Sequence, residues 1–301
     1  MVHVHNFSYG LLNPALAYLT SCLGCFLGLQ CTARARALQG AARVRWLLLA
    51  GVSIGTTGIW VMHFIAMLGF SIPGQVITYN VPVTILSMLI AVGVVSVGLL
   101  IVGFGGEGLG PLLLGGMIIG LGVASMHYMG MWAMRMPDSM GYGPRLLLAS
   151  VLIAIVAGTA ALWAALRLAS VWHTLLASLI MGVAVSGMHY TGMAAMHVSL
   201  APDGGMAAMG SGVSAQAFLL PLILGITAVT FVLAAIITLA PTEAELREDA
   251  DLLERIARMS GSPGGRSGSP GSRSGSSGGR SGSPGGRSAD PAGVFRRPDA
   301  L

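Results

Sequence analysis

Three copies of a short motif carry the residues of this chain that are best suited to bind a metal. Each copy reads Met-His-aromatic-x-small-Met, and the histidines are 64 and then 62 residues apart. Imidazole and thioether groups form a soft ligand set that favours copper, Cu(I) especially, over magnesium or calcium. Zinc accepts histidine but rarely a thioether. The candidate ligands are Met62, His63 and Met67, then Met126, His127 and Met131, then Met188, His189 and Met193.

The spacing within each copy suits a helix. His63 and Met67 are four residues apart, as are the corresponding pairs in the other copies. Residues four apart lie on one face of an α-helix, so each pair could ligate one ion. The alternative is packing, because methionine often fills core gaps and a single histidine in a helix is often only hydrogen-bonded. Three ionisable residues inside membrane spans favour a functional site, since such residues are costly there.

Two further motif positions are expected to serve packing. The aromatic residue after each histidine is predicted to anchor at the membrane interface. The small residue three positions after each histidine is predicted to allow close helix approach. These positions are Phe64, Tyr128 and Tyr190 for the aromatic residue, and Ala66, Gly130 and Gly192 for the small one.

The composition indicates that the motifs lie in a membrane protein. Of 301 residues, 54% are hydrophobic and 9% are charged, and the mean hydropathy is +0.78. A soluble domain carries about 25% charged residues. Long apolar runs with almost no charge are typical of membrane helices. The predicted spans are approximately 9–31, 46–70, 82–104, 111–134, 146–169, 171–196 and 218–240.

Charge sets the predicted orientation. Four arginines in the segment 32–45 mark it as cytoplasmic, so the N-terminus is predicted outside and the C-terminus inside. Each motif then ends an even-numbered span, and all three share one depth near the outer membrane face. We therefore expect an all-α integral membrane protein with seven transmembrane helices and three internal two-helix repeats. It would be a multi-pass protein of the inner (plasma) membrane, with the three motif helices converging at their outer ends.

Four regions follow from this pattern. Residues 1–8 form a short outer N-terminus, and residues 9–240 form the membrane domain. Residues 241–259 are acidic and predicted to form a short cytoplasmic helix. Residues 260–301 form a Gly/Ser/Pro/Arg repeat tail that is predicted to be disordered. The net charge of +5 reflects the arginine segment and the tail, so it indicates topology and no nucleic-acid partner.

The motif also carries a family resemblance. The third copy contains the string Met-His-Tyr-Thr at residues 188–191, and the three in-phase copies resemble the MHYT family of bacterial membrane sensor domains over roughly residues 9–240. The resemblance implies copper bound by the motif methionines and histidines, and sensing of oxygen, carbon monoxide, nitric oxide or redox state. Many relatives continue into GGDEF, EAL or histidine-kinase domains. Only about 60 residues follow the last span here, so we expect a separate cytoplasmic signalling protein as partner.

Other functional classes fit less well. The sequence contains no nucleophile-base-acid set, no phosphate-binding loop and no paired catalytic carboxylates, so we expect no enzymatic activity. A copper transporter needs ligands at successive depths, and only Met117 and Met181 lie in inner halves of the spans. A haem-binding redox protein that moves electrons across the membrane would want histidines at two depths. Cys22 and Cys25 lie deep in the first span, where they are expected to act as small apolar residues.

Overall fold

The computed structural model describes residues 8–72, 77–106, 108–135, 139–168, 170–199, 213–239, 251–256 and 258. The chain divides into two units, Met1–Pro241 and Thr242–Leu301. In the second unit, residues 251–256 are helical, within the segment predicted as an acidic helix. The predicted tail 260–301 and residues 1–7 of the predicted N-terminus lie outside the described residues.

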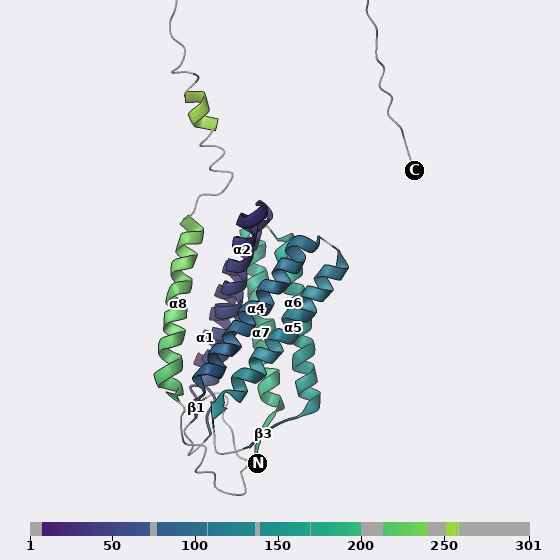
Figure 1. The fold of residues 1–301 in the computed structure, drawn as a ribbon. Helices are drawn as coiled ribbons and strands as arrows, with labels where there is room; N and C mark the ends of the chain where they lie inside the picture. The colour runs from purple at the N-terminus through teal and green to yellow at the C-terminus, as the bar shows by residue number, and fades with distance from the viewer. Residues whose placement is uncertain are drawn as a thin grey trace, which may run out of the picture. The chain divides into compact units, whose positions relative to one another are not determined.

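Within the described residues, seven helices are long and apolar enough to cross a membrane, which confirms the predicted number of spans (Figure 1). Their ends differ from the predicted ones by a few residues. The orientation of the helices relative to the two sides of the membrane stays a prediction. The helices are α1 Leu12–Arg36, α2 Gly40–Ser53 with η1 Ile54–Val61 and α3 Met62–Leu68, α4 Val81–Gly105, α5 Leu109–Trp132, α6 Pro144–Arg167, α7 Val171–Ala195 and α8 Ala215–Leu239.

The arginine-rich segment 32–45 is mostly helical, although it was predicted to lie between the first two spans. α1 continues to Arg36, and α2 begins at Gly40. The carbonyls in the last turn of a helix lack partners within that helix. Arg36 donates to two such carbonyls at the end of α6, and Arg34 donates to one near the end of α8. These arginines therefore satisfy the backbone of neighbouring helices at this end of the bundle.

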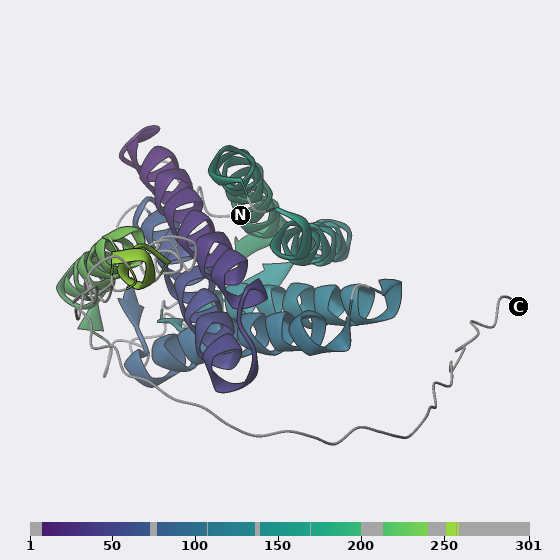
Figure 2. The same cartoon turned by 90° about the horizontal axis from the view of Figure 1, so that it is seen from above.

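Six of the helical spans form a closed ring, and α8 packs outside it. The order around the ring is α1, the span Gly40–Leu68, α4, α5, α6 and α7, which returns to α1 (Figure 2). Small residues set the spacing: a Cβ added at Gly55 would lie only 2.7 Å from the Cα of Val92 in α4. Helices in lipid gain little hydrophobic free energy from association, so such close backbone packing supplies much of the attraction.

The second span is not a uniform α-helix. Its middle part, η1, is π-helical and ends one residue before Met62. In contrast, α5 and α7 are α-helical through their own motifs. π-helical segments are rare and often lie at functional sites. The sequence pattern did not predict this feature.

One backbone hydrogen bond recurs in each of the three repeats. A residue just before the first helix of the repeat donates its N–H to the carbonyl at the end of the motif helix. The pairs are Ser8 with Gly69 at 3.0 Å, Asn80 with Ala133 at 2.9 Å, and Gly143 with Ala195 at 2.7 Å. Each bond satisfies a carbonyl that the helix leaves unpaired. The three helix pairs are thus closed in the same way, as expected for internal repeats.

Short antiparallel strands connect the repeats where the motif helices end (Figure 1). The sequence pattern predicted helices and no strands in this part of the chain. Tyr79 of β1 is buried against Phe64 with ring centroids 5.8 Å apart, and burial raises its pKa. The strands thus fix the ends of the motif helices. The pairs are β1 (Thr78–Tyr79) with β2 (Met134–Arg135) and with β5 (Val213–Ser214), and β3 (Ser139–Tyr142) with β4 (Met196–Ser199).

Candidate metal centre

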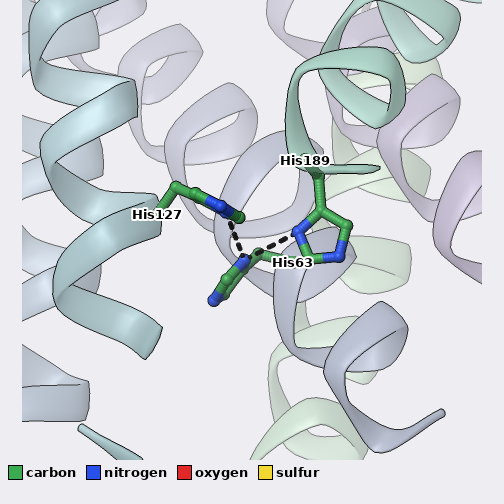
Figure 3. Close-up of side chains that lie close together, drawn as sticks. All are labelled: His63, His127 and His189. Atoms are coloured by element: carbon green, nitrogen blue, oxygen red, sulfur yellow. Dashed lines mark hydrogen bonds between the residues drawn. The ribbon is translucent and has the colours of Figure 1, made fainter. Parts of the chain in front are cut away.

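The three motif histidines meet at one place inside the ring (Figure 3). His63 comes from α3, His127 from α5 and His189 from α7. The Nδ1 atom of His63 lies 3.0 Å from Nδ1 of His189 and 3.1 Å from Nδ1 of His127. The three ring centroids are 5.0, 5.0 and 5.1 Å apart. This confirms the expected convergence of the motif helices.

The cluster is buried and carries no carboxylate. None of the three side chains is more than 1% exposed. Within the described part of the chain, they are the one group of three or more histidine, cysteine or acidic residues placed to hold a metal, with ligand atoms within 4.8 Å of one another. Polar groups buried together in this way need partners, because leaving them unsatisfied costs free energy.

No arrangement of protons gives Nδ1 of His63 two normal hydrogen bonds. A neutral imidazole nitrogen either carries a proton and donates, or has a lone pair and accepts. Nδ1 of His63 faces two other nitrogens, so its single proton or its single lone pair would have to be shared between both contacts as weakened bonds. Otherwise two lone pairs or two N–H groups face each other. A cation among the three nitrogens removes the conflict, because every lone pair can then point at the ion.

The distances fit such an ion. A metal about 2.0–2.1 Å from each imidazole nitrogen requires nitrogens roughly 3.3–3.5 Å apart. The two distances at His63, 3.0 and 3.1 Å, are within a few tenths of an ångström of that range. Imidazole suits zinc, copper, iron and nickel, whereas magnesium and calcium prefer oxygen ligands. The three histidines could therefore hold a metal ion, and their imidazoles suit a transition metal.

Gly130 and Gly192 provide the space that the histidine rings occupy. A Cβ added at Gly130 would lie 2.5 Å from Nε2 of His63, and one added at Gly192 would collide with Nε2 of His127. These small residues were predicted to allow close helix approach, but they accommodate a histidine of the preceding repeat. The Nε2 atoms of His63 and His127 are buried and have no hydrogen-bond partner among the described residues. In most metal sites, the ring N–H of a ligating histidine is donated to an acceptor.

The aromatic residue after each histidine supports the cluster and is not simply an interfacial anchor. Each packs edge-on against its own histidine, with ring centroids 4.7–4.9 Å apart. Phe64 is fully buried, which contradicts the expected interfacial position. The hydroxyl of Tyr128 lies 2.7 Å from that of Ser150 in α6. These contacts restrict the orientation of the imidazoles.

The six motif methionines are also buried. Met67, Met131 and Met193 each lie one turn beyond a histidine, on the same face of its helix. Their thioethers are therefore suitably positioned along the helix to approach an ion held by the histidines. Their role as ligands, and that of Met62, Met126 and Met188, stays a prediction.

Asn13 is a supporting residue whose role the sequence pattern did not predict. Its side-chain amide donates to the carbonyl of Ile65, two residues after His63, over 3.0 Å. That carbonyl lies in the last turn of α3, where intrahelical partners run out. The amide therefore fixes α1 to the first motif helix. A polar residue inside an apolar span was the available signal, because it needs a partner there.

The family model described as "Bacterial signalling protein N terminal repeat", MHYT, matches residues 57–115, 120–178 and 182–247. Each matched segment begins shortly before one motif histidine and continues into the next helix. With the repeats divided in this way, α1 lies before the first matched segment. It nevertheless completes the ring between α7 and the first motif span.

Curated relatives are bacterial signalling proteins. The bifunctional diguanylate cyclase/cyclic di-GMP phosphodiesterase MucR of Pseudomonas aeruginosa is 35% identical over 64% of this chain and 29% of its own length. The cyclic di-GMP phosphodiesterase NbdA of the same organism is 36% identical over 65% of this chain and 26% of its own length. The signaling protein YkoW of Bacillus subtilis is 30% identical over 67% of this chain and 26% of its own length. The chain thus spans less than a third of each relative, and no solved structure matches it.

Proposed function

Since the chain belongs to the MHYT family of bacterial signalling-protein repeats, we propose that it is a membrane sensor that binds copper at the three-histidine cluster. The copper would respond to a diatomic gas, namely oxygen, carbon monoxide or nitric oxide, or to redox state. The proposed role is sensory and not catalytic. Since two relatives are named for cyclic di-GMP synthesis or breakdown, we propose cyclic di-GMP turnover by a separate cytoplasmic partner as the output.

The observation that carries the metal proposal is the double contact at Nδ1 of His63. Two imidazole nitrogens lie 3.0 and 3.1 Å from it inside an apolar bundle. A metal ion is the simplest partner for three converging lone pairs. Copper is favoured over zinc because six buried methionines flank the histidines along their helices, and thioethers select Cu(I).

Neighbouring contacts suggest how a change at the cluster could reach the output side. His63 follows η1, and Thr57 of η1 shares a buried hydrogen bond with Thr230 of α8, at 2.6 Å. α8 lies outside the ring and contacts η1 and α3. A ligand-induced shift of His63 would therefore act first on η1 and then on α8. Once bound, copper would supply a coordination position for the gas or a change of oxidation state.

A haem protein is the weaker alternative. The three ring centroids are about 5 Å apart, which leaves no room for a porphyrin between them. Transport is also weaker, because the described residues hold one layer of clustered histidines, with no second cluster at another depth.

Metal analysis of the detergent-purified full chain tests the proposal. We expect copper in the wild type and its loss in the variant His63→Ala/His127→Ala/His189→Ala. His173→Ala is the matched control, because His173 lies exposed in the first turn of α7, the helix that carries His189. Its copper content should equal that of the wild type. Equal copper in the triple variant, or a haem Soret band in the wild type, would refute the copper site.

A further inference from the structure

An apolar cavity of about 40 Å³ lies inside the ring. Its lining comes from α1, η1, α4, α5, α6 and α7, which are the six elements that surround the interior. No described side chain of α8 lines it. The cavity is therefore a feature of the ring as a whole and not a gap between two neighbouring helices.

The position of the cavity relative to the histidines follows from three of its lining residues. Ile59, Val123 and Val185 each come four residues before a motif histidine, and all three line the cavity. One helical turn is about 5.4 Å along the axis. The cavity therefore begins about one turn from the histidine layer, on the side opposite Met67, Met131 and Met193. Ile119 and Met181, four residues earlier again, extend it by another turn.

The lining determines what the cavity can hold. None of the fifteen lining residues has a nitrogen or oxygen atom in its side chain. The most polarisable atoms in the lining are the sulfur atoms of Cys25, Met181 and Met188. A buried water needs about two to four polar partners, and apolar cavities stay dry and bind apolar guests such as xenon. A single water requires about 10–15 Å³ on this scale. The cavity therefore suits an apolar guest of two or three heavy atoms.

We propose that this cavity is a docking site for a small apolar molecule of the dioxygen class. The molecule would bind about one helical turn from the histidine cluster. The docking role rests on the proposed sensor function, because a sensor must bring its gas to the histidine cluster. The cavity itself depends only on the packing of the ring. Binding of a gas to the cavity and binding of copper to the histidines can therefore be tested separately.

Xenon is the probe for the first test, because it needs no metal. The full chain, with ¹³C-labelled methionine methyl groups, is purified in detergent and its methyl NMR spectrum is followed under xenon pressure. We expect saturable shifts of the Met181 and Met188 signals, since both residues line the cavity. The signals of Met67 and Met131, beyond the histidine layer, should change by less than about a fifth as much.

A filled cavity provides the matched comparison. Ala161 lines the cavity, whereas the adjacent Ala160 is exposed on the outside of the same helix. Ala161→Leu should abolish the xenon shifts, and Ala160→Leu should leave them unchanged. Ala157→Leu, at another lining position, is the substitute if Ala161→Leu does not fold. Xenon shifts that are absent from the wild type, or that persist in a folded filled variant, would overturn the proposal.

The second test concerns the copper-loaded protein and carbon monoxide. Ala161→Leu should slow carbon monoxide association by about tenfold or more, with copper content unchanged. An unchanged rate would overturn the role of the cavity as a docking site on the way to the cluster. If the wild type binds xenon in the cavity but holds no copper, the sensor function fails while the cavity assignment stands.

Discussion

The imidazole of His63 occupies the space in which a side chain at Gly130 would lie. A Cβ there would be 2.5 Å from Nε2 of His63, and one at Gly192 would collide with His127 in the same way. Each of these glycines is three residues after the histidine of its own repeat, but it accommodates the histidine of the repeat before. The motif of one repeat therefore shapes the ligand of another, and no single repeat can form the cluster.

Gly130→Ala and Gly192→Ala should each weaken metal binding. The added methyl group forces His63 or His127 away from the other imidazoles. We expect a loss of about 10–100-fold in copper affinity, the size found when the groups that orient metal ligands are removed. Competition with a Cu(I) chelator measures it.

Gly187→Ala in α7 is the matched control for both variants, because a Cβ there meets nothing within 4 Å. It should bind copper like the wild type and stabilise its helix slightly, since alanine is favoured over glycine by about 1 kcal/mol. Wild-type affinity in Gly130→Ala would mean that His63 does not need its observed position to bind the metal.

Spacing and hydropathy predicted the seven spans and the meeting of the three histidines, because both depend on regular helix periods. They did not predict the π-helical η1, whose residues look like any apolar helix. They also assigned Phe64 to the interface, although it is buried and packs against Tyr79 of β1. The role of Gly130 was missed for the same reason: the group it accommodates is 67 residues earlier in the sequence.

Asn13→Leu should destabilise the protein by about 1–3 kcal/mol, the cost of leaving a buried carbonyl unsatisfied. Leucine has the same number of side-chain heavy atoms but cannot donate to the carbonyl of Ile65. Thr20→Val is the control, since the hydroxyl of Thr20 bonds only within its own helix. Unfolding in mixed micelles measures the difference. Equal stability of Asn13→Leu and wild type would show that α1 is held to α3 without this bond.

The predicted orientation can be tested with single cysteines. Gln39 connects α1 and α2, and Arg145 lies exposed at the start of α6, at the other end of the bundle. In intact cells, a membrane-impermeant maleimide should label Arg145→Cys and should label Gln39→Cys only after lysis. The native cysteines are buried and should give little background. The reverse pattern would place the N-terminus inside.

The last prediction separates ligand from packing among the methionines. Met67→Leu/Met131→Leu/Met193→Leu removes three thioethers one turn from the histidines and keeps the side-chain volumes nearly constant, so each substitution should cost less than about 1.5 kcal/mol in stability. Met117→Leu is the control, because Met117 is 49% exposed on α5. It should change neither stability nor metal affinity.

If the thioethers ligate copper, the triple variant should bind Cu(I) at least about tenfold more weakly, which corresponds to about 1.4 kcal/mol. Cu(II) affinity should fall less, because imidazole is the stronger ligand for that state and thioether favours Cu(I). Chelator competition under reducing and oxidising conditions measures both. If both affinities stay at their wild-type values in a folded triple variant, these methionines only pack, and the site rests on His63, His127 and His189 alone.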